Sequence, residues 1–247
     1  MEKQPCIAIK NAAFGYKKAA AVSTVLKQVS LDFYPNDLVG IVGLNGTGKS
    51  TLLKSMCGLL PLLQGEVLIG NAAIGTLELA ELAKKIAVVL TEKIAGFNLT
   101  AYDVVASGQM PYTGAFHKLY AANQVIIGQA IEACGIKAHQ HKLLNELSDG
   151  LFQKTVIAKA LAQQTPVMLL DEPTAFLDYA SKHELFLLLK KLSEKEDKCI
   201  LVSSHDLDLL LKYCNKLVVI SGQDAVIIPA ADARQNKAFM EIGGGFI

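Results

Sequence analysis

Arginine is almost absent from this sequence. Arg234 is the single arginine among 24 basic residues, and no block of like charges occurs. Proteins that bind nucleic acid usually carry a basic stripe rich in arginine. The net charge of +1, from 24 basic and 23 acidic residues, gives no general attraction to a polyanion either. We therefore expect no nucleic acid among the partners of this chain.

Long apolar runs are also missing, although 51% of the 247 residues are hydrophobic. No run approaches the roughly 20 apolar residues that a membrane-spanning helix needs. The first ten residues, MEKQPCIAIK, lack the basic-then-apolar order of a signal peptide. We expect a cytoplasmic protein whose apolar residues form mainly a large core, with a partner interface as the alternative use.

The cysteines show no metal-binding or disulfide spacing. They are scattered, and no C-x-x-C pair occurs, which argues against a zinc site or a disulfide framework and fits a reducing compartment. We interpret all five as small core residues; they are Cys6, Cys57, Cys134, Cys199 and Cys214.

The order of apolar segments predicts an α/β fold. The length suits one large domain or one domain with a subdomain, and no internal repeat is visible. Short apolar or alternating runs alternate with helical patterns through most of the chain, which is typical of a parallel sheet. The stretch from about 100 to 144 has a helical pattern and predicts an inserted helical subdomain. Expected strands are 7–9, 26–33, 38–42, 66–69, 86–90, 167–170 and 199–203, with a hairpin at 218–220 and 225–228; expected helices are 49–58, 156–162 and 183–193.

A phosphate-binding loop follows the expected strand 38–42. Residues 43–50 read GLNGTGKS and match G-x-x-x-x-G-K-[ST] between a strand and a helix. Glycines let successive backbone N–H groups turn toward phosphate oxygens, and the helix N-terminus adds its positive end. A chance match in a glycine-rich turn is the alternative. The predicted nucleotide-phosphate contacts are Gly43, Asn45, Gly46, Thr47, Gly48, Lys49, Ser50 and Thr51, with Lys49 reaching the β- and γ-phosphates and Ser50 binding Mg²⁺.

Acidic residues end a later apolar strand. Residues 167–173 read VMLLDEP, which places Asp171 at the carboxyl edge of the sheet, where α/β folds bind ligands. We expect Asp171 to hold Mg²⁺ through water and Glu172 to orient the attacking water. His205 also follows an apolar strand, and we expect it to contact the γ-phosphate; a structural histidine is the alternative.

The motifs in this order resemble the ATP-binding subunit of an ABC transporter. The order comprises the phosphate loop, a signature-like turn at 147–150, the acidic strand, Leu177-Asp178 and His205, and the likeness covers essentially the whole chain. It implies an α/β P-loop NTPase fold with a mixed or parallel sheet core, an N-terminal antiparallel β subdomain and a helical subdomain. The single domain 1–247 would divide into a core, about 1–90 and 155–247, and a helical subdomain, about 92–154.

The resemblance also implies how such a chain works. ATP and Mg²⁺ would be enclosed between two copies, with Ser148 and Gly150 of one copy meeting the ATP held by the other, and Asp178 would join these contacts. Tyr16 would stack on adenine, while a core or surface tyrosine is the alternative. Glu172 and His205 would be catalytic. The dimer would lie at the cytoplasmic face of the membrane, and its closing and opening would drive transmembrane permease subunits. A substrate-binding protein would be an indirect partner, through the permease.

Asp149 departs from the family pattern Leu-Ser-Gly-Gly-Gln, because the turn here reads LSDGL. Two like charges about 6 Å apart would cost roughly 3 kcal/mol at an effective dielectric constant of about 20, enough to weaken ATP binding. We expect the carboxylate to point outward, since aspartate tolerates left-handed backbone and favours a helix N-terminus. The hypothesis is a tolerated helix cap.

Two further departures occur. Thr91, followed by Glu92, stands where the family usually has a glutamine that touches Mg²⁺. Either residue could bind the ion or a water, and we assign Thr91 to the metal contacts. Phe176 precedes Leu177-Asp178, where small residues are commoner; it would pack either at the dimer seam or in its own core.

The stretch 99–114 is similar to the helical subdomain of ATPases that serve iron–siderophore, haem and cobalamin importers. Gln109 replaces the arginine usual in a Gly-Arg-x-Pro-aromatic run. An importer of iron chelates or cobalamin is therefore the leading interpretation. The alternatives are a nucleotide-dependent regulatory module with weak ATPase, crippled by Asp149 and Thr91, and the ATPase of another ABC system. The sequence does not define the cargo.

Overall fold

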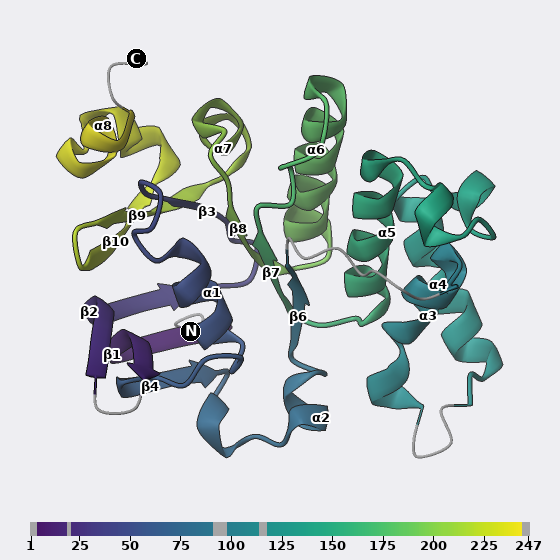
Figure 1. Ribbon diagram of the computed structural model, residues 1–247, viewed down its shortest axis with the longest axis horizontal. Coiled ribbons are helices and arrows are strands. Elements are labelled where there is room, and N and C mark those ends of the chain that lie inside the picture. Colours follow the sequence, from purple (N-terminus) through teal and green to yellow (C-terminus); the bar gives the residue numbers. More distant parts are fainter. Residues whose placement is uncertain (1–3, 19–20, 91–97, 114–117, 244–247) are drawn as a thin grey trace.

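An outer antiparallel sheet forms one side of the molecule. The computed structural model describes residues 4–18, 21–90, 98–113 and 118–243. Figure 1 shows the outer sheet, a core sheet and a block of helices side by side. The outer sheet has the strand order β2-β1-β4-β5. Its strands are β1 (Ile7–Lys18), β2 (Ala21–Phe33), β4 (Gln64–Ile69) and β5 (Ala72–Ala73).

The β1–β2 hairpin is longer than the apolar pattern predicts. Register shifts interrupt the pairing between Ile9 and Ala12 and again up to Gly15. Asn11 and Gln28 have positive φ angles of 44° and 49°, as expected where an extra residue bulges out of a strand. Each bulge resets the alternation of side chains, so only the regular parts of these strands could be predicted from period-two patterning.

The core sheet has the order β10-β9-β3-β8-β7-β6. Strands β9, β3, β8, β7 and β6 are parallel, and β10 closes an antiparallel hairpin with β9, as the sequence predicts. Every residue of β3, β7 and β8 is buried, which explains their continuous apolar composition. The strands are β3 (Leu38–Val42), β6 (Ile86–Val89), β7 (Val167–Asp171), β8 (Cys199–Ser203), β9 (Lys216–Ser221) and β10 (Asp224–Pro229).

Helices cover both faces of the core sheet. Helix α1 (Lys49–Met56) contacts β1 of the outer sheet and β7 of the core sheet, so it lies between them. Helices α6 (Tyr179–Lys195) and α7 (Leu207–Tyr213) pack on the core sheet beside β3 (Figure 1). The remaining short helices are α2 (Leu79–Leu82) and α8 (Lys237–Gly243). In the described part of the chain, no helix is long and apolar enough to cross a membrane.

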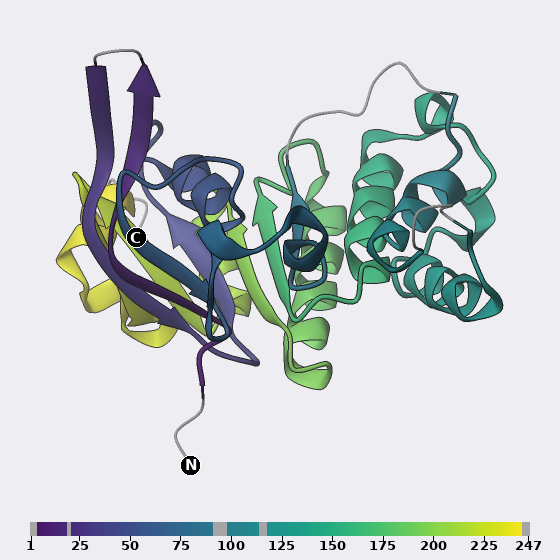
Figure 2. The same cartoon turned by 90° about the horizontal axis from the view of Figure 1, so that it is seen from below.

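Helices α3 (Ala101–Ser107), α4 (Ala121–Ala133) and α5 (Asp149–Ala162) form the helical block, which Figure 2 shows at the end of the molecule opposite the outer sheet. The predicted start of the helix at 156–162 was wrong. Helix α5 begins directly after Ser148, whose Oγ accepts a hydrogen bond from the Leu151 N–H at 3.4 Å. The predicted subdomain boundary at residue 154 falls inside this continuous helix.

Gln109 has a structural role in the helical block. Its side chain is 1% exposed; Nε2 donates to the Ala162 carbonyl, and Oε1 accepts from Asn123 Nδ2 at 2.7 Å. One buried amide thus joins the ends of α3, α4 and α5, where an arginine would place a charge that no carboxylate in this network neutralises.

Gln163, directly after α5, connects the helical block to the core. Its Nε2 donates to the carbonyls of Ala83 and Ile86, at 2.6 and 2.9 Å, just before and at the start of β6. Its own carbonyl accepts from the Tyr112 hydroxyl at 3.0 Å. The end of α5 is therefore fixed to the core sheet and to the 109–113 segment together.

Candidate functional site

An open cavity of about 310 Å³ lies at the carboxyl ends of β3, β8 and β7, which are neighbours in the core sheet. Polar side chains that follow these three strands meet there, although they are far apart in the sequence. The lining residues are Tyr16, Val25, Asn45, Gly46, Gly48, Lys49, Ser50, Thr51, Glu172 and His205.

The phosphate loop has the backbone that its glycines permit. Gly46 and Gly48 have φ angles of 79° and 108°, where a side chain causes strain. A Cβ on Gly48 would also collide with Val25 Cγ1 of β2. Gly48 is the N-cap of α1, and no side chain caps that helix, so its first N–H groups remain available to an anion. This arrangement fits the predicted phosphate contacts.

Lys49 is held inside the loop by its own backbone. The side chain is 8% exposed, and Nζ donates to the Gly43 carbonyl at 2.9 Å. Burial lowers the pKa of Lys49, while the charges of Glu172 and Asp171 raise it. The ammonium group thus lies at the edge of the cavity, where its positive charge can meet an incoming phosphate, while the neighbouring carboxylates suit a cation.

Ser203 holds the Asp171 carboxylate and the backbone of Glu172, a role that the sequence analysis missed. Its Oγ donates to Asp171 Oδ1 at 2.7 Å and accepts from the Glu172 N–H at 2.9 Å. Ser203 is fully buried and lies opposite Asp171 in the β7–β8 register. The only signal in the sequence was a hydroxyl residue at the end of an apolar strand.

Glu172 has a left-handed backbone, with a φ of 50°. Its Oε1 lies 3.1 Å from His205 Nε2, so the two predicted catalytic side chains are in contact. Burial raises the pKa of Glu172, while the charges of His205 and Lys49 lower it. The imidazole is 56% exposed and can therefore turn toward a ligand in the cavity.

Tyr16 lies at the rim of the same cavity. Its hydroxyl and Thr51 Oγ1 are 2.9 Å apart, which fixes the ring beside the start of α1. The residue is 42% exposed, so it offers an aromatic face to a planar base.

Ser148, Gly150 and Asp178 do not line this cavity. Ser148 and Gly150 lie at the N-terminus of α5 in the helical block, and Asp178 caps α6 by accepting from the Ser181 N–H at 2.7 Å. Asp149 is exposed in the first turn of α5. Its φ is not positive, so the expectation based on left-handed backbone was wrong, and the favourable position at a helix N-terminus remains the explanation.

The donor set fits Mg²⁺ held together with a phosphate ligand. The described residues contain no cluster of three or more His, Cys, Asp or Glu side chains arranged for a metal. Mg²⁺ instead uses one or two carboxylates, waters and substrate phosphates. Asp171, at the end of β7, and Ser50, exposed at the cavity, supply such a set. Thr91, the third predicted metal contact, lies outside the described residues.

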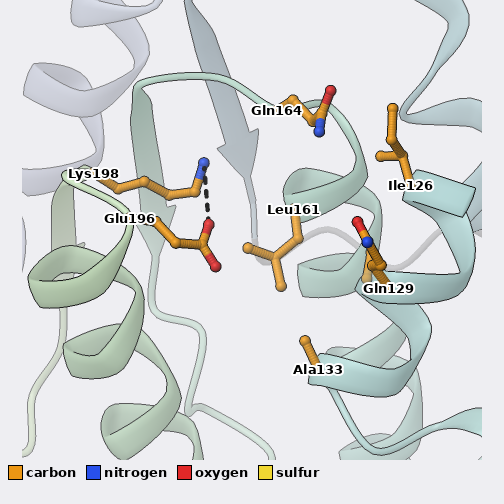
Figure 3. A pocket seen from close by; sticks show the side chains of 8 residues that line it. Ile126, Gln129, Ala133, Leu161, Gln164, Glu196 and Lys198 are labelled. Atoms are coloured by element: carbon orange, nitrogen blue, oxygen red, sulfur yellow. Dashed lines mark ion pairs between the residues drawn. The ribbon is translucent and has the colours of Figure 1, made fainter. Parts of the chain in front are cut away.

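A larger cavity, about 380 Å³, lies between the helical block and the turn before β8 (Figure 3). Its one buried charge is already compensated: Lys198 Nζ donates to the Thr165 carbonyl at 2.9 Å and lies 3.8 Å from Glu196 Oε2. It holds no phosphate loop and no pair of carboxylates. Size alone therefore does not identify the functional site.

Comparisons with known proteins agree with this geometry. The family model described as ABC transporter matches residues 26–175. An uncharacterized ABC transporter ATP-binding protein of Methanocaldococcus jannaschii, MJ0873, is 40% identical over 82% of this chain and 70% of its own length. The probable siderophore transport system ATP-binding protein YusV of Bacillus subtilis is 33% identical over 88% of this chain and 78% of its own length. The cobalamin import ATP-binding protein BtuD of Halobacterium salinarum is 35% identical over 81% of this chain, which corresponds to half of its own length.

Solved structures show the same fold. A dimeric structure of MJ0796, a bacterial ABC transporter cassette, aligns with a TM-score of 0.79 at 28% identity, covering 91% of this chain and 98% of that one. An inward-facing putative metal-chelate type ABC transporter aligns with a TM-score of 0.81 at 22% identity, covering 96% of this chain and 89% of that one. The chain belongs to the ABC transporter family, as one of its ATP-hydrolysing cassettes.

Proposed function

We propose that this chain is the ATP-hydrolysing subunit of an importer for iron chelates or cobalamin. Two copies enclose ATP, the phosphate loop of one copy facing Ser148 and Gly150 of the other. The observation that supports this arrangement is the open cavity: Lys49, Glu172 and His205 line it, while the Ser148 turn of the same chain is elsewhere, in the helical block. A second copy supplies the missing side.

Each group of the cavity has a defined task in this proposal. The N–H groups at the start of α1 and the Lys49 ammonium bind the phosphates. Glu172, held by its own N–H on Ser203 Oγ at 2.9 Å, orients water and accepts its proton. His205 turns from Glu172 to the γ-phosphate, and the Tyr16 ring supports the base. Mg²⁺, held by Ser50 and Asp171, would neutralise charge that develops on the phosphates.

Two observations favour the importer class. Relatives of this chain carry the names of cobalamin import, siderophore transport and petrobactin import proteins. The run from Gly108 to Tyr112 keeps the proline and aromatic residues of that subgroup, and the buried Gln109 amide secures the segment to α4 and α5. Permease subunits, a substrate-binding protein and a place at the cytoplasmic face of the membrane follow from this class.

An uptake assay tests the proposal. The chain is reconstituted in liposomes with its permease subunits, and ATP-driven uptake of a ferric siderophore, haem and cobalamin is compared. We expect one of these three cargoes to accumulate at least about tenfold above the same system without ATP. ATP hydrolysis without uptake of any of them would contradict the cargo class, and absence of an ATP-dependent dimer would contradict the shared site.

Asp149→Gly tests whether the departure in the signature turn weakens the motor. We expect ATP turnover of the assembled complex to stay within about threefold of the parent, because Asp149 is exposed at a helix N-terminus. Asp208→Gly, also in the first turn of a helix, is the matched control for loss of helix stability. Steady-state phosphate release measures both variants; a tenfold gain for Asp149→Gly alone would mean that the carboxylate repels the bound nucleotide.

A further inference from the structure

Two cysteines that are far apart in the sequence meet on the edge of the molecule opposite the ATP cavity. Cys6 directly precedes β1, and Cys199 is the first residue of β8, whereas the ATP site lies at the carboxyl end of that strand. Cys199 is fully buried in the apolar cluster between the two sheets, and the half-buried Cys6 packs against the same cluster.

The backbone around the β2–β3 turn explains this meeting. The Cys6 N–H donates to the carbonyl of Phe33, the last residue of β2, at 2.7 Å. After a short turn, the Asp37 carbonyl accepts from the Ile200 N–H at 2.8 Å, and Leu38 pairs with Ile200. Phe33, before the turn, therefore lies beside Cys6, and the residues after the turn pair with Ile200, the neighbour of Cys199. The turn thus connects the first strands of the outer sheet to β8.

The two thiols share one apolar cluster between the sheets and differ in character. A side-chain hydrogen bond from Cys199 lowers the pKa of Cys6, and burial and the charge of Asp37 oppose this effect. The hydrogen bond with Cys6, and then burial, raise the pKa of Cys199; Asp37 acts in the same direction and Lys216 against it. Asp37 Oδ2 and Lys216 Nζ are paired at 2.8 Å.

The other three cysteines lack this arrangement. Cys57, Cys134 and Cys214 are buried, and burial raises the pKa of each thiol, that of Cys134 to about 12. A thiol with a raised pKa and no access reacts slowly, because the thiolate is the nucleophile. Cys6 is thus accessible to solvent, lies near a second thiol, and has the lower pKa of the two.

We infer that Cys6 and Cys199 form a redox-responsive pair, in which Cys6 is the attacking thiol and Cys199 the resolving thiol. The oxidant is a low-molecular-weight disulfide. Cys6 thiolate attacks one of its sulfurs, forming a mixed disulfide and releasing one thiolate. Cys199 gives up its proton, attacks the Cys6 sulfur and releases the second thiolate. Two protein thiols are oxidised while one small disulfide is reduced to two thiols.

The product would bind the outer sheet covalently to the core sheet. The bond closes a loop of roughly 190 residues, a length for which the entropy of the unfolded chain is strongly reduced. Neither sulfur lines the ATP cavity, so oxidation changes the rigidity between the sheets without occupying the phosphate site.

Oxidised glutathione tests the inference on the folded chain. After reduction and removal of the reductant, the native protein is incubated with oxidised glutathione, quenched by alkylation and mapped by mass spectrometry without reduction. We expect a peptide that links Cys6 to Cys199, formed at least about tenfold faster than modification of the other cysteines. The thermal midpoint of the oxidised protein should rise by roughly 5 °C or more and return to the reduced value after dithiothreitol.

Single substitutions separate the two roles. Cys199→Ser should accumulate glutathione on Cys6, Cys6→Ser should leave Cys199 unmodified, and Cys57→Ser, the matched control, should form the cross-link as the parent does. Cys199→Ala replaces the serine variant if a buried hydroxyl prevents folding. Glutathione that stays on Cys6 in the parent without a cross-link would overturn the inference, and so would reaction of Cys6 no faster than that of Cys57.

Discussion

Glu172→Gln is expected to lower ATP turnover by about 10²- to 10⁴-fold, the range typical of losing a general base. The amide has nearly the same size as the carboxylate but does not accept the proton of the attacking water. Lys49 and the backbone of the phosphate loop stay in place, so we expect ATP affinity to remain within a fewfold of the parent. Phosphate release and titration with a fluorescent ATP analogue measure the two quantities separately.

Glu196→Gln is the matched control for this variant. Glu196 pairs with Lys198 in the separate cavity of Figure 3. The same chemical change at that position should leave turnover within about twofold. If Glu172→Gln retains a third or more of the parent turnover, Glu172 is not the base, and the role of His205 beside it must be reassigned as well.

Lys49→Ala is expected to weaken ATP binding by about 10- to 100-fold, because a hydrogen bond to a charged group contributes roughly 1.5–3 kcal/mol. Turnover should fall further, by at least about 10²-fold, since charge on the phosphates increases in the transition state. Lys49 is nearly buried, and its Nζ is held by the Gly43 carbonyl at 2.9 Å. No other described lysine lines the cavity, so none can replace it. Isothermal titration with Mg-ATP measures affinity directly.

Lys54→Ala on the same helix controls for a general loss of positive charge. Lys54 is in the last turn of α1 and does not line the cavity, so ATP affinity should be unchanged. The thermal midpoint of both variants shows whether the fold is intact, and Lys49→Met keeps the aliphatic stem if alanine is destabilising. ATP affinity of folded Lys49→Met within threefold of the parent would contradict the assignment.

Much of the phosphate site could be predicted because its physics is local. A strand, a glycine turn and a helix N-terminus are consecutive in the chain, so the loop from Gly43 to Ser50 is visible as one motif. Asp171 and Glu172 were predictable for a similar reason, since carboxyl ends of parallel strands share one edge of a sheet. The α/β class and the β9–β10 hairpin followed from the period of the apolar residues.

What could not be predicted depends on contacts between distant segments. Ser203 acts on Asp171 across the β7–β8 register, and Val25 of β2 occupies the space that forbids a side chain at Gly48. The sequence showed Gln109 only as a replacement of the usual arginine. Its structural role could not be predicted, because its hydrogen-bond partners lie on α4 and α5. The Cys6–Cys199 contact depends on how two sheets pack, and no spacing rule within one chain segment encodes that.

The left-handed backbone at Glu172 has an evolutionary consequence. For a residue with a Cβ, that conformation costs on the order of 1–2 kcal/mol, a cost that glycine would not have. If selection acted on thermal stability alone, we would expect glycine at this position. The carboxylate therefore carries a backbone cost that glycine would avoid, and we expect a related cassette that no longer hydrolyses ATP to lose it early.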